Sequence, residues 1–321
     1  MRANISIPCA MMDTLLLAMP SVAHLEILSD VDYQVTTYPD DTYDIHLKTS
    51  VLGKSVYVVH AMHNPTHNNL IQLVYMCRLL KQKGAQSIRV FLTYCAYLRQ
   101  AQTQNHKEQH LMIKLISDML NNSGITEMAI LDPHVDILGQ YTNFPIYSIP
   151  SLSLFQPMMT SLLQSLARPL IVSPDAGSHH RAENFSRCIN ADAVTMHKER
   201  DPESQIPYIT LNEDVKGRNC IIVDDMLATG QTLQQAAQTL KSHGAQSIYA
   251  IVTHALCLQP MIYKNIDILF VSNSVLIKHM PRGVAVHMTY LQELISHLLN
   301  EGMPSQPGSS QQNSSSHLNR L

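Results

Sequence analysis

The sequence predicts an α/β protein of two tandem domains, each a parallel sheet flanked by helices. An internal repeat is the first observation: residues 79–98 (LLKQKGAQSIRVFLTYCAYL) match residues 239–258 (TLKSHGAQSIYAIVTHALCL). Both copies have a helical pattern that ends at a glycine and is followed by an apolar strand. The second observation lies upstream, where GKSVYVVH at 53–60 matches GRNCIIVD at 217–224. A unit of strand, loop, helix and strand therefore occurs twice, as a parallel sheet requires.

The limits of the domains follow from local composition. The segment YSIPSLSLFQP at 147–157 carries two prolines and no charge, so we place the boundary there and assign residues 1–150 and 151–302 to the two domains. Residues 303–321 are rich in Ser, Gln and Asn and lack the apolar content of a packed core. This composition predicts a disordered tail.

Overall composition narrows the class of protein. The chain has 321 residues, 45% of them hydrophobic and 15% charged, with a formal net charge of -3, so nothing in its charge favours a nucleic acid or a membrane as partner. Six cysteines form no CxxC pair, which favours reduced thiols. Asp13 and Pro20 interrupt the apolar stretch near the N-terminus, which is a poor signal peptide and too short to span a bilayer. We therefore expect a cytoplasmic protein.

The most informative stretch is DDMLATGQT at 224–232, between an apolar run and a helical pattern. Cys220 to Val223 predict a short buried strand. Backbone N–H groups of the loop and of the first helical turn suit a phosphate, and Gly230 lets the backbone approach it closely. The carboxylates of Asp224 and Asp225 reach ribose hydroxyls or a metal ion. The order of these parts predicts a site for a phosphorylated sugar, with an ordinary strand-to-helix turn or a receiver-like acidic pocket as the alternative.

This loop resembles the ribose-phosphate loop of the phosphoribosyltransferase fold, and the duplicated domain resembles the ribose-phosphate diphosphokinases. The resemblance extends to about residue 300 and implies two tandem phosphoribosyltransferase-type domains. It implies transfer of the diphosphoryl group of ATP to the 1-hydroxyl of ribose 5-phosphate, which gives phosphoribosyl pyrophosphate (PRPP) and AMP, with Mg²⁺ as cofactor. Five further segments resemble segments of this family: HAMHNPTHNNL at 60–70, YCAYLRQ at 94–100, LDPHVDILGQY at 131–141, VSPDAGSHHRAENFS at 172–186 and HKER at 197–200.

The resemblance also assigns roles to individual residues. Lys198 and Arg200 would be catalytic, neutralising the migrating phosphates from a loop that closes over them. His134 and Asp175 would hold magnesium, His134 directly, through water or through ATP. The first domain would bind ATP through Tyr38, Asp40, Arg99, Gln100 and His134. The second would bind ribose 5-phosphate through Asp224, Asp225, Ala228, Thr229, Gly230, Gln231 and Thr232.

Some of these residues have simpler interpretations. Lys198 and Arg200 alternate with other polar residues and also fit a solvated charged turn. Asp175 follows a proline and also fits an ordinary turn. Three histidines at 60, 63 and 67 suggest a zinc site, but their spacing fits no strong ligand motif and no cysteine joins them.

Departures from the family pattern lie mostly on the ATP side. After Gln100 the family continues with an acidic residue and a basic pair, whereas this chain reads AQTQNHKEQH. Thr42 stands where the family has glutamate, and Ala228 where it often has aspartate. An alternative is therefore a catalytically weak paralogue that binds ribose phosphate or PRPP and regulates a partner. A phosphoribosyltransferase is less favoured, since no base-binding hood is recognisable. The family's dimers and hexamers imply a homo-oligomer.

Overall fold

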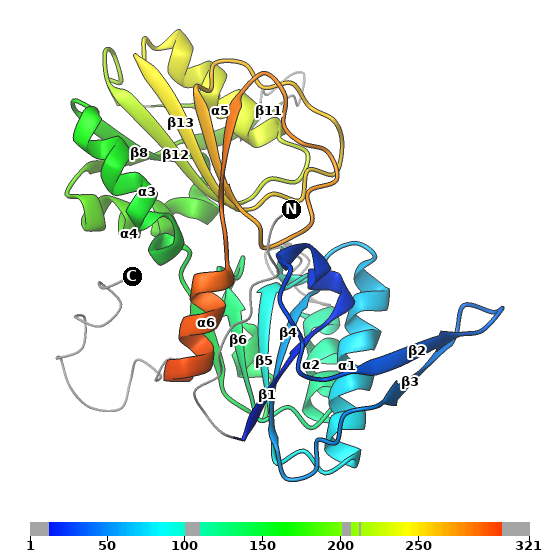
Figure 1. Ribbon diagram of the computed structural model, residues 1–321. Coiled ribbons are helices and arrows are strands. Elements are labelled where there is room, and N and C mark those ends of the chain that lie inside the picture. The colour runs from blue at the N-terminus through cyan, green and yellow to red at the C-terminus, as the bar shows by residue number, and fades with distance from the viewer. Residues whose placement is uncertain (1–12, 100–109, 201–206, 212, 304–321) are drawn as a thin grey trace. The chain divides into compact units, whose positions relative to one another are not determined.

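The computed structural model describes residues 13–99, 110–200, 207–211 and 213–303 (Figure 1). The described chain forms two compact units. The first contains the residues up to Pro150 together with those from Leu291 onward, and the second runs from Ser151 to Tyr290. Both are α/β units built on a parallel sheet, as the sequence predicts. The predicted tail lies outside the described residues, apart from Met303.

The first unit has a five-stranded parallel sheet in the order β1-β4-β5-β6-β7. A separate antiparallel hairpin, β2–β3, projects from the body of this unit (Figure 1). The strands are β1 (Thr14–Ala18), β2 (Tyr33–Thr37), β3 (Tyr43–Leu47), β4 (Ser55–Ala61), β5 (Ser87–Tyr94), β6 (Glu127–Leu131) and β7 (Ile146–Ile149). The helices are η1 (Pro20–Leu25), α1 (Thr66–Gln82), α2 (Leu111–Asn121), η3 (Leu138–Gln140) and α6 (Gln292–Glu301).

The second unit has a six-stranded parallel sheet in the order β15-β14-β13-β12-β8-β9. A short antiparallel pair, β10–β11, stands outside this sheet. The strands are β8 (Pro169–Ser173), β9 (Asp192–Thr195), β10 (His197–Arg200), β11 (Pro207–Thr210), β12 (Asn219–Met226), β13 (Ser247–His254), β14 (Ile268–Ser272) and β15 (Ala285–Thr289). The helices are α3 (Leu152–Ser165), η4 (Ala176–Ser178), α4 (His179–Ile189) and α5 (Gln231–Ser242).

The internal repeat is confirmed in detail. The two sheets have the same strand order, apart from β9, which is an added edge strand of the second sheet. In this comparison β1, β4, β5, β6 and β7 correspond to β8, β12, β13, β14 and β15. Strands β5 and β13 have the same pattern of buried and half-buried positions from their first residue to their last. The glycines that end α1 and α5, Gly84 and Gly244, have φ of 84° and 86° and accept the N–H of Gly53 and Gly217 at 2.8 and 2.9 Å. The two copies therefore share not only their strand order but also individual backbone hydrogen bonds.

Strand β12 is buried on both faces, which explains its uninterrupted apolar run. Successive side chains point to opposite faces of a sheet. Cys220 and Ile222 pack into the core beneath α5 with Ala236 and Leu240, and Ile221 joins the opposite core beneath α3 and α4. The two cores fix the position of β12, and with it the position of the polar residues at its carboxyl end.

Helix α6 packs with the first unit, although it follows the second along the chain. The Gln292 side-chain amide donates to the Leu25 carbonyl oxygen at 2.7 Å, and the Tyr57 hydroxyl donates to Met303 Sδ at 3.8 Å. Of the five cysteines that the structure describes, four are buried as free thiols, and Cys188 is exposed. Among the described helices, none combines the length and the apolar character needed to cross a bilayer.

The repeat makes a prediction for Gly244, which has φ of 86° and whose Cβ, if present, would lie 3.3 Å from Lys216 Cγ. Gly244→Ala should lower the free energy of unfolding by about 1–2 kcal/mol, because an L-residue is strained in the left-handed region. Gly139→Ala is the matched control, since its added Cβ would meet only Ile146 Cβ, at 3.8 Å. Urea unfolding of both variants measures the difference. An equal loss of unfolding free energy in the two variants would contradict the conclusion that Gly244 is required for its left-handed backbone conformation.

Candidate functional site

The acid pair predicted from the sequence lies at the carboxyl end of β12. The strand extends to Met226, so Asp224 and Asp225 are part of it rather than of the loop behind it, a correction to the shorter strand expected. Asp224 pairs with Val252 of β13, which keeps its backbone in the sheet ladder. Asp225 is buried and Asp224 is half-buried. A sheet edge therefore holds both carboxylates in fixed directions.

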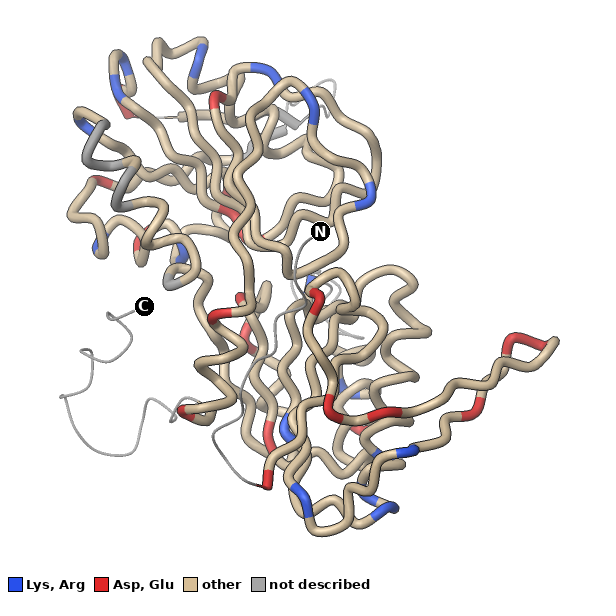
Figure 2. Tube along the Cα trace, in the orientation of Figure 1, with Lys and Arg blue, Asp and Glu red and all other residues tan. Residues whose placement is uncertain are grey.

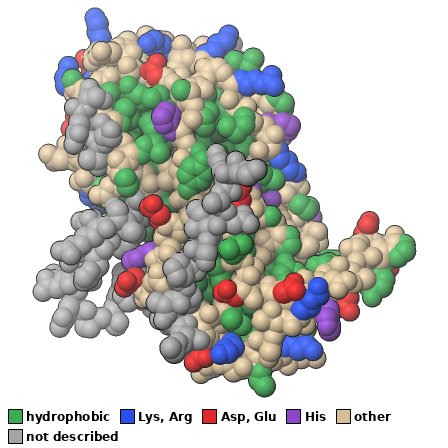
Figure 3. Space-filling view, viewed as in Figure 1, with side chains coloured by type: hydrophobic (Ala, Val, Ile, Leu, Met, Phe, Trp, Pro, Cys, Tyr) green, Lys and Arg blue, Asp and Glu red, His purple; other side chains and the backbone are tan. Residues whose placement is uncertain are grey.

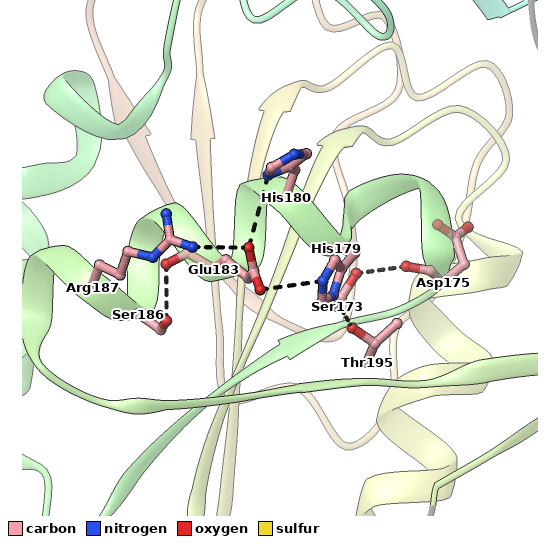
Figure 4. Close-up of polar contacts among 8 residues, drawn as sticks. All are labelled: Ser173, Asp175, His179, His180, Glu183, Ser186, Arg187 and Thr195. Carbon is pink, nitrogen blue, oxygen red and sulfur yellow. Dashed lines mark hydrogen bonds and ion pairs between the residues drawn. The ribbon is translucent and has the colours of Figure 1, made fainter.

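Ser178 joins the acid pair to Asp175 and was not predicted from the sequence. Its hydroxyl donates to Asp224 Oδ1 at 2.5 Å. Asp175 caps helix η4 by accepting the N–H of Gly177 at 3.0 Å and of Ser178 at 3.3 Å. The backbone of Asp175 is held in turn by the Ser173 hydroxyl, which donates to its carbonyl oxygen at 2.6 Å (Figure 4). Asp175 is thus a turn residue, as the simpler interpretation held, and is also linked to Asp224 through Ser178.

Like charges and burial shape the electrostatics of this edge. Burial is the main cause that raises the pKa of Asp224 well above its usual range, and the carboxylates of Asp225 and Asp175 raise it further. The hydrogen bond from Ser178 acts in the opposite direction. The edge therefore concentrates negative charge that a cation or the hydroxyl donors of a sugar would neutralise.

The loop behind the acid pair ends at Gly230, the N-cap of α5. Gly230 has φ of 80°, and a Cβ there would lie 2.2 Å from the Tyr263 hydroxyl oxygen and 2.5 Å from Met261 Sδ, so only glycine fits. Three backbone hydrogen bonds hold the loop to the end of β13 and the segment that follows it: Leu227 N to His254 O at 2.9 Å, Cys257 N to Leu227 O at 2.8 Å and Leu258 N to Ala228 O at 3.0 Å.

The first turn of α5 has the geometry of an anion cradle. N–H groups in the first turn of a helix have no acceptor within it, and the helix dipole makes this end electropositive. Thr229 and Gln231 are exposed at this end, and Ala228 and Thr232 are half-buried. The structure therefore brings Asp224, Asp225 and residues 228–232 to one edge, as the sequence predicts, and adds Asp175 through Ser178.

The segment predicted as a closing loop begins as a strand. In β10, Lys198 pairs with Ile209 and Arg200 with Pro207 of β11, so the base of the segment is a two-stranded arm rather than a charged turn. Residues 201–206 and the side chains of Lys198 and Arg200 lie outside the described part of the structure. Just before the arm, Thr195 Oγ1 lies 2.7 Å from His179 Nδ1 (Figure 4). This contact ties the root of the arm to the start of α4.

The other ring nitrogen of His179 lies close to a carboxylate on the same helix. His179 Nε2 is 3.3 Å from Glu183 Oε1, and Glu183 Oε2 also accepts from Arg187 at 3.1 Å (Figure 4). Both His179 and His180 are exposed at the start of α4.

Two of the predicted ATP residues lie on the projecting hairpin of the first unit. Tyr38 is 49% exposed at its tip, and acidic residues cluster around it (Figure 2). Hydrophobic and acidic side chains lie side by side on this hairpin (Figure 3). Asp40 Oδ1 accepts from Thr42 Oγ1 at 2.6 Å and from Thr42 N at 3.2 Å, which lowers the pKa of Asp40. One carboxylate oxygen of Asp40, the residue predicted to contact adenine, is therefore already hydrogen-bonded to Thr42.

The other predicted ATP residues follow strands of the first sheet. Arg99 is exposed in the segment after β5, and His134 is half-buried in the segment after β6. Gln100 lies outside the described residues. The hairpin carries Tyr38 and Asp40 out of the body of the unit, so the structure does not gather them with Arg99 and His134 (Figure 1).

In the first unit, His60 takes the place of Asp224 in the repeat. It is fully buried, its Nε2–H donates to the Asn69 carbonyl oxygen at 2.9 Å, and its Nδ1 accepts from the Ser21 hydroxyl at 2.9 Å. Burial lowers the pKa of His60 to about 3, so the ring is neutral. His63 Nε2 lies 2.8 Å from the Ser21 carbonyl oxygen. Protein groups therefore contact the ring nitrogens of both histidines.

The carboxylates at the carboxyl edge of the second sheet can be compared with the ligands that magnesium, the cofactor expected from the resemblance, takes in proteins. The described residues contain no group of three or more His, Cys, Asp or Glu side chains placed to hold a metal alone. Magnesium in proteins commonly takes one or two carboxylates and completes its shell with water and substrate phosphates. The mutually repelling carboxylates of Asp175, Asp224 and Asp225 fit that pattern.

Comparison with known proteins agrees with this geometry. The profile of the N-terminal domain of ribose phosphate pyrophosphokinase matches residues 17–124, and that of the phosphoribosyl transferase domain matches residues 162–281. A ribose-phosphate pyrophosphokinase of Wolinella succinogenes is 31% identical over 220 residues, covering 68% of this chain and 70% of that protein.

The chain belongs to the ribose-phosphate pyrophosphokinase family. Another relative of that name, from Chromobacterium violaceum, is 31% identical over 244 residues, covering 75% of this chain and 72% of its own length. The crystal structure of phosphoribosylpyrophosphate synthetase from Mycobacterium smegmatis has the same fold, with a TM-score of 0.78 at 20% identity over 89% of this chain and 97% of the other. The duplicated phosphoribosyltransferase-type fold expected from the sequence is confirmed.

The raised pKa of Asp224 predicts how stability depends on pH. A carboxyl whose pKa is higher in the folded state than in the unfolded state lowers stability in full once pH exceeds the folded-state pKa. This penalty shrinks as pH falls and is gone below the pKa of the unfolded state. Asp224→Asn, which keeps an acceptor for Ser178, should therefore raise the melting temperature at pH 8 in magnesium-free buffer and converge with the parent protein in acid.

Glu213→Gln, which changes an exposed carboxylate of the same unit, is the control and should not change the melting temperature in this way. Calorimetric melting of the three proteins between pH 8 and pH 4 provides the comparison. A lower melting temperature for Asp224→Asn at pH 8 would contradict the electrostatic account.

Proposed function

We propose that this protein transfers the diphosphoryl group of ATP to the 1-hydroxyl of ribose 5-phosphate, giving PRPP and AMP. The main support is the carboxyl edge of the second sheet, where the half-buried Asp224 and the buried Asp225 precede the loop that leads to the glycine-capped N-terminus of α5. A phosphorylated sugar needs both features: donors for its phosphate and acceptors for its hydroxyls. Membership of the family supports the same reaction.

The second unit would bind ribose 5-phosphate. Backbone N–H groups and hydroxyls of residues 228–232 would hold the 5-phosphate, and Asp224 and Asp225 would accept hydrogen bonds from the ribose hydroxyls. Because Ser178 and the β12 backbone fix Asp224, the sugar would be oriented before reaction. Such positioning is the larger part of catalysis in phosphoryl and diphosphoryl transfer.

Lys198 and Arg200 would stabilise the charge that develops during transfer. Their strand β10 is paired with β11, which gives the two cations a defined base from which to approach the phosphates. Asp175 and the substrate phosphates would hold magnesium, which would neutralise phosphate charge, and His134 of the first unit would contact magnesium directly, through water or through ATP. The chain itself would supply orientation and the two positive side chains.

The first unit would bind ATP through Tyr38, Asp40, Arg99, Gln100 and His134. An exposed tyrosine on a projecting hairpin suits stacking on adenine, with Asp40 accepting the amino group through its remaining oxygen. Because the hairpin leaves the body of its own unit, we propose that it serves a neighbouring subunit in a cytoplasmic homo-oligomer.

A second candidate is a weakly catalytic paralogue that binds ribose phosphate or PRPP and regulates a partner enzyme. Thr42 favours it, since this residue occupies one oxygen of Asp40 and supplies no carboxylate of its own. This candidate predicts ribose 5-phosphate binding without turnover.

Turnover of the purified protein with ribose 5-phosphate, ATP and magnesium distinguishes the two candidates. We expect AMP and PRPP in equal amounts, and Lys198→Ala should lower kcat by about 10²–10³, the usual loss on removing a group that stabilises transition-state charge. Lys216→Ala, which removes an exposed lysine of the same unit, should leave kcat unchanged. Binding without products would favour the regulatory paralogue, and absence of ribose 5-phosphate binding would contradict both candidates.

A further inference from the structure

Tyr263 lies against the phosphate loop with a hydroxyl that the proposed mechanism does not use. The residue is only 3% exposed and belongs to the core cluster beneath α5. Its hydroxyl oxygen lies 2.2 Å, and its Cζ 3.0 Å, from the position that a Cβ on Gly230 would occupy. The hydroxyl is therefore directed at the N-cap of α5, a helix of 12 residues whose first turn is the proposed phosphate cradle.

The local backbone fixes this direction. The Tyr263 N–H donates to the Arg282 carbonyl oxygen at 2.8 Å. On the next residue, Lys264 N donates to Gln234 Oε1 at 2.8 Å, and Gln234 Nε2 donates back to the Lys264 carbonyl oxygen at 3.1 Å. Since Gln234 belongs to the first turns of α5, the segment that carries Tyr263 is bonded directly to the helix whose N-terminus the hydroxyl faces.

Although Tyr263 is only 3% exposed, no hydrogen bond links its hydroxyl to another group in the described part of the chain. The hydroxyl oxygen is not among the fully enclosed polar atoms that lack a partner, so it keeps some access to solvent and can reach a ligand. Burial raises the pKa of Tyr263 to about 12, and the nearby Cys257 thiol adds to this effect. The phenol therefore stays protonated across the physiological range and can donate a hydrogen bond to an anion.

We infer that Tyr263 is a ligand-binding residue whose hydroxyl donates a hydrogen bond to the 5-phosphate of ribose 5-phosphate seated at the N-terminus of α5. The inference rests on the proposed function, because it assumes that this sugar phosphate occupies the loop. It adds a side-chain donor to a cradle otherwise built from backbone N–H groups and small hydroxyls. The unpartnered hydroxyl of the free protein becomes satisfied when the ligand binds.

Tyr263→Phe tests the inference because phenylalanine keeps the ring and removes only the hydroxyl. The dissociation constant of ribose 5-phosphate, measured by calorimetry, should rise about 10-fold or more, as expected for loss of a hydrogen bond to a charged group. The melting temperature of the ligand-free variant should be equal to or higher than that of the parent, since no bond is lost. Tyr249→Phe on β13, at a half-buried tyrosine, is the matched control and should leave binding unchanged.

Three outcomes would overturn the inference. Unchanged affinity in Tyr263→Phe would leave the proposed function standing and remove the role of the hydroxyl. Weaker binding together with a lower melting temperature of the free variant would show that the hydroxyl is structural. Failure of the parent protein to bind ribose 5-phosphate would overturn both the inference and the proposed function.

Discussion

The carboxylate of Asp224, half-buried next to that of Asp225, is the interaction on which the rest of the site depends. Burial and like charge both oppose its ionisation, so the folded protein carries a local cost at neutral pH. Three features keep the group in place: the β12 ladder, the Ser178 hydroxyl and the backbone N–H of Asp225, which donates to Asp224 Oδ1 at 2.9 Å. A cost retained at one sheet edge is typical of a binding site that its ligand completes.

The two copies of the repeat show how one scaffold supports opposite solutions at the same edge. In the first copy, His60 is neutral and both ring nitrogens are satisfied by Ser21 and Asn69, so that edge closes on itself. In the second copy, the equivalent position carries Asp224, and the adjoining loop ends at Gly230, the N-cap of α5. Identical strand order and glycine geometry in both copies indicate that the difference arises from a few side chains at the strand ends.

The sequence predicted the features that depend on local pattern. The repeat, the buried strand and the helix after Gly230 follow from periodicity and glycine position, and each is present. Other features depend on contacts between distant segments and have no local signal. Ser178 meets Asp224 across 46 residues, Tyr263 meets Gly230, and α6 packs with the first unit after the second is complete. Apart from the resemblance, Asp175 after a proline suggested only a turn, because the sequence does not show which strand ends beside it.

A crystal structure of the protein with ribose 5-phosphate bound tests the central claim most directly. The account predicts the 5-phosphate at the N-terminus of α5, in contact with residues 228–232, and the ribose hydroxyls on Asp224 and Asp225. The first copy should remain closed around His60. A sugar phosphate bound at the His60 loop, or bound with its hydroxyls away from the acid pair, would contradict the assignment of the site to the second unit.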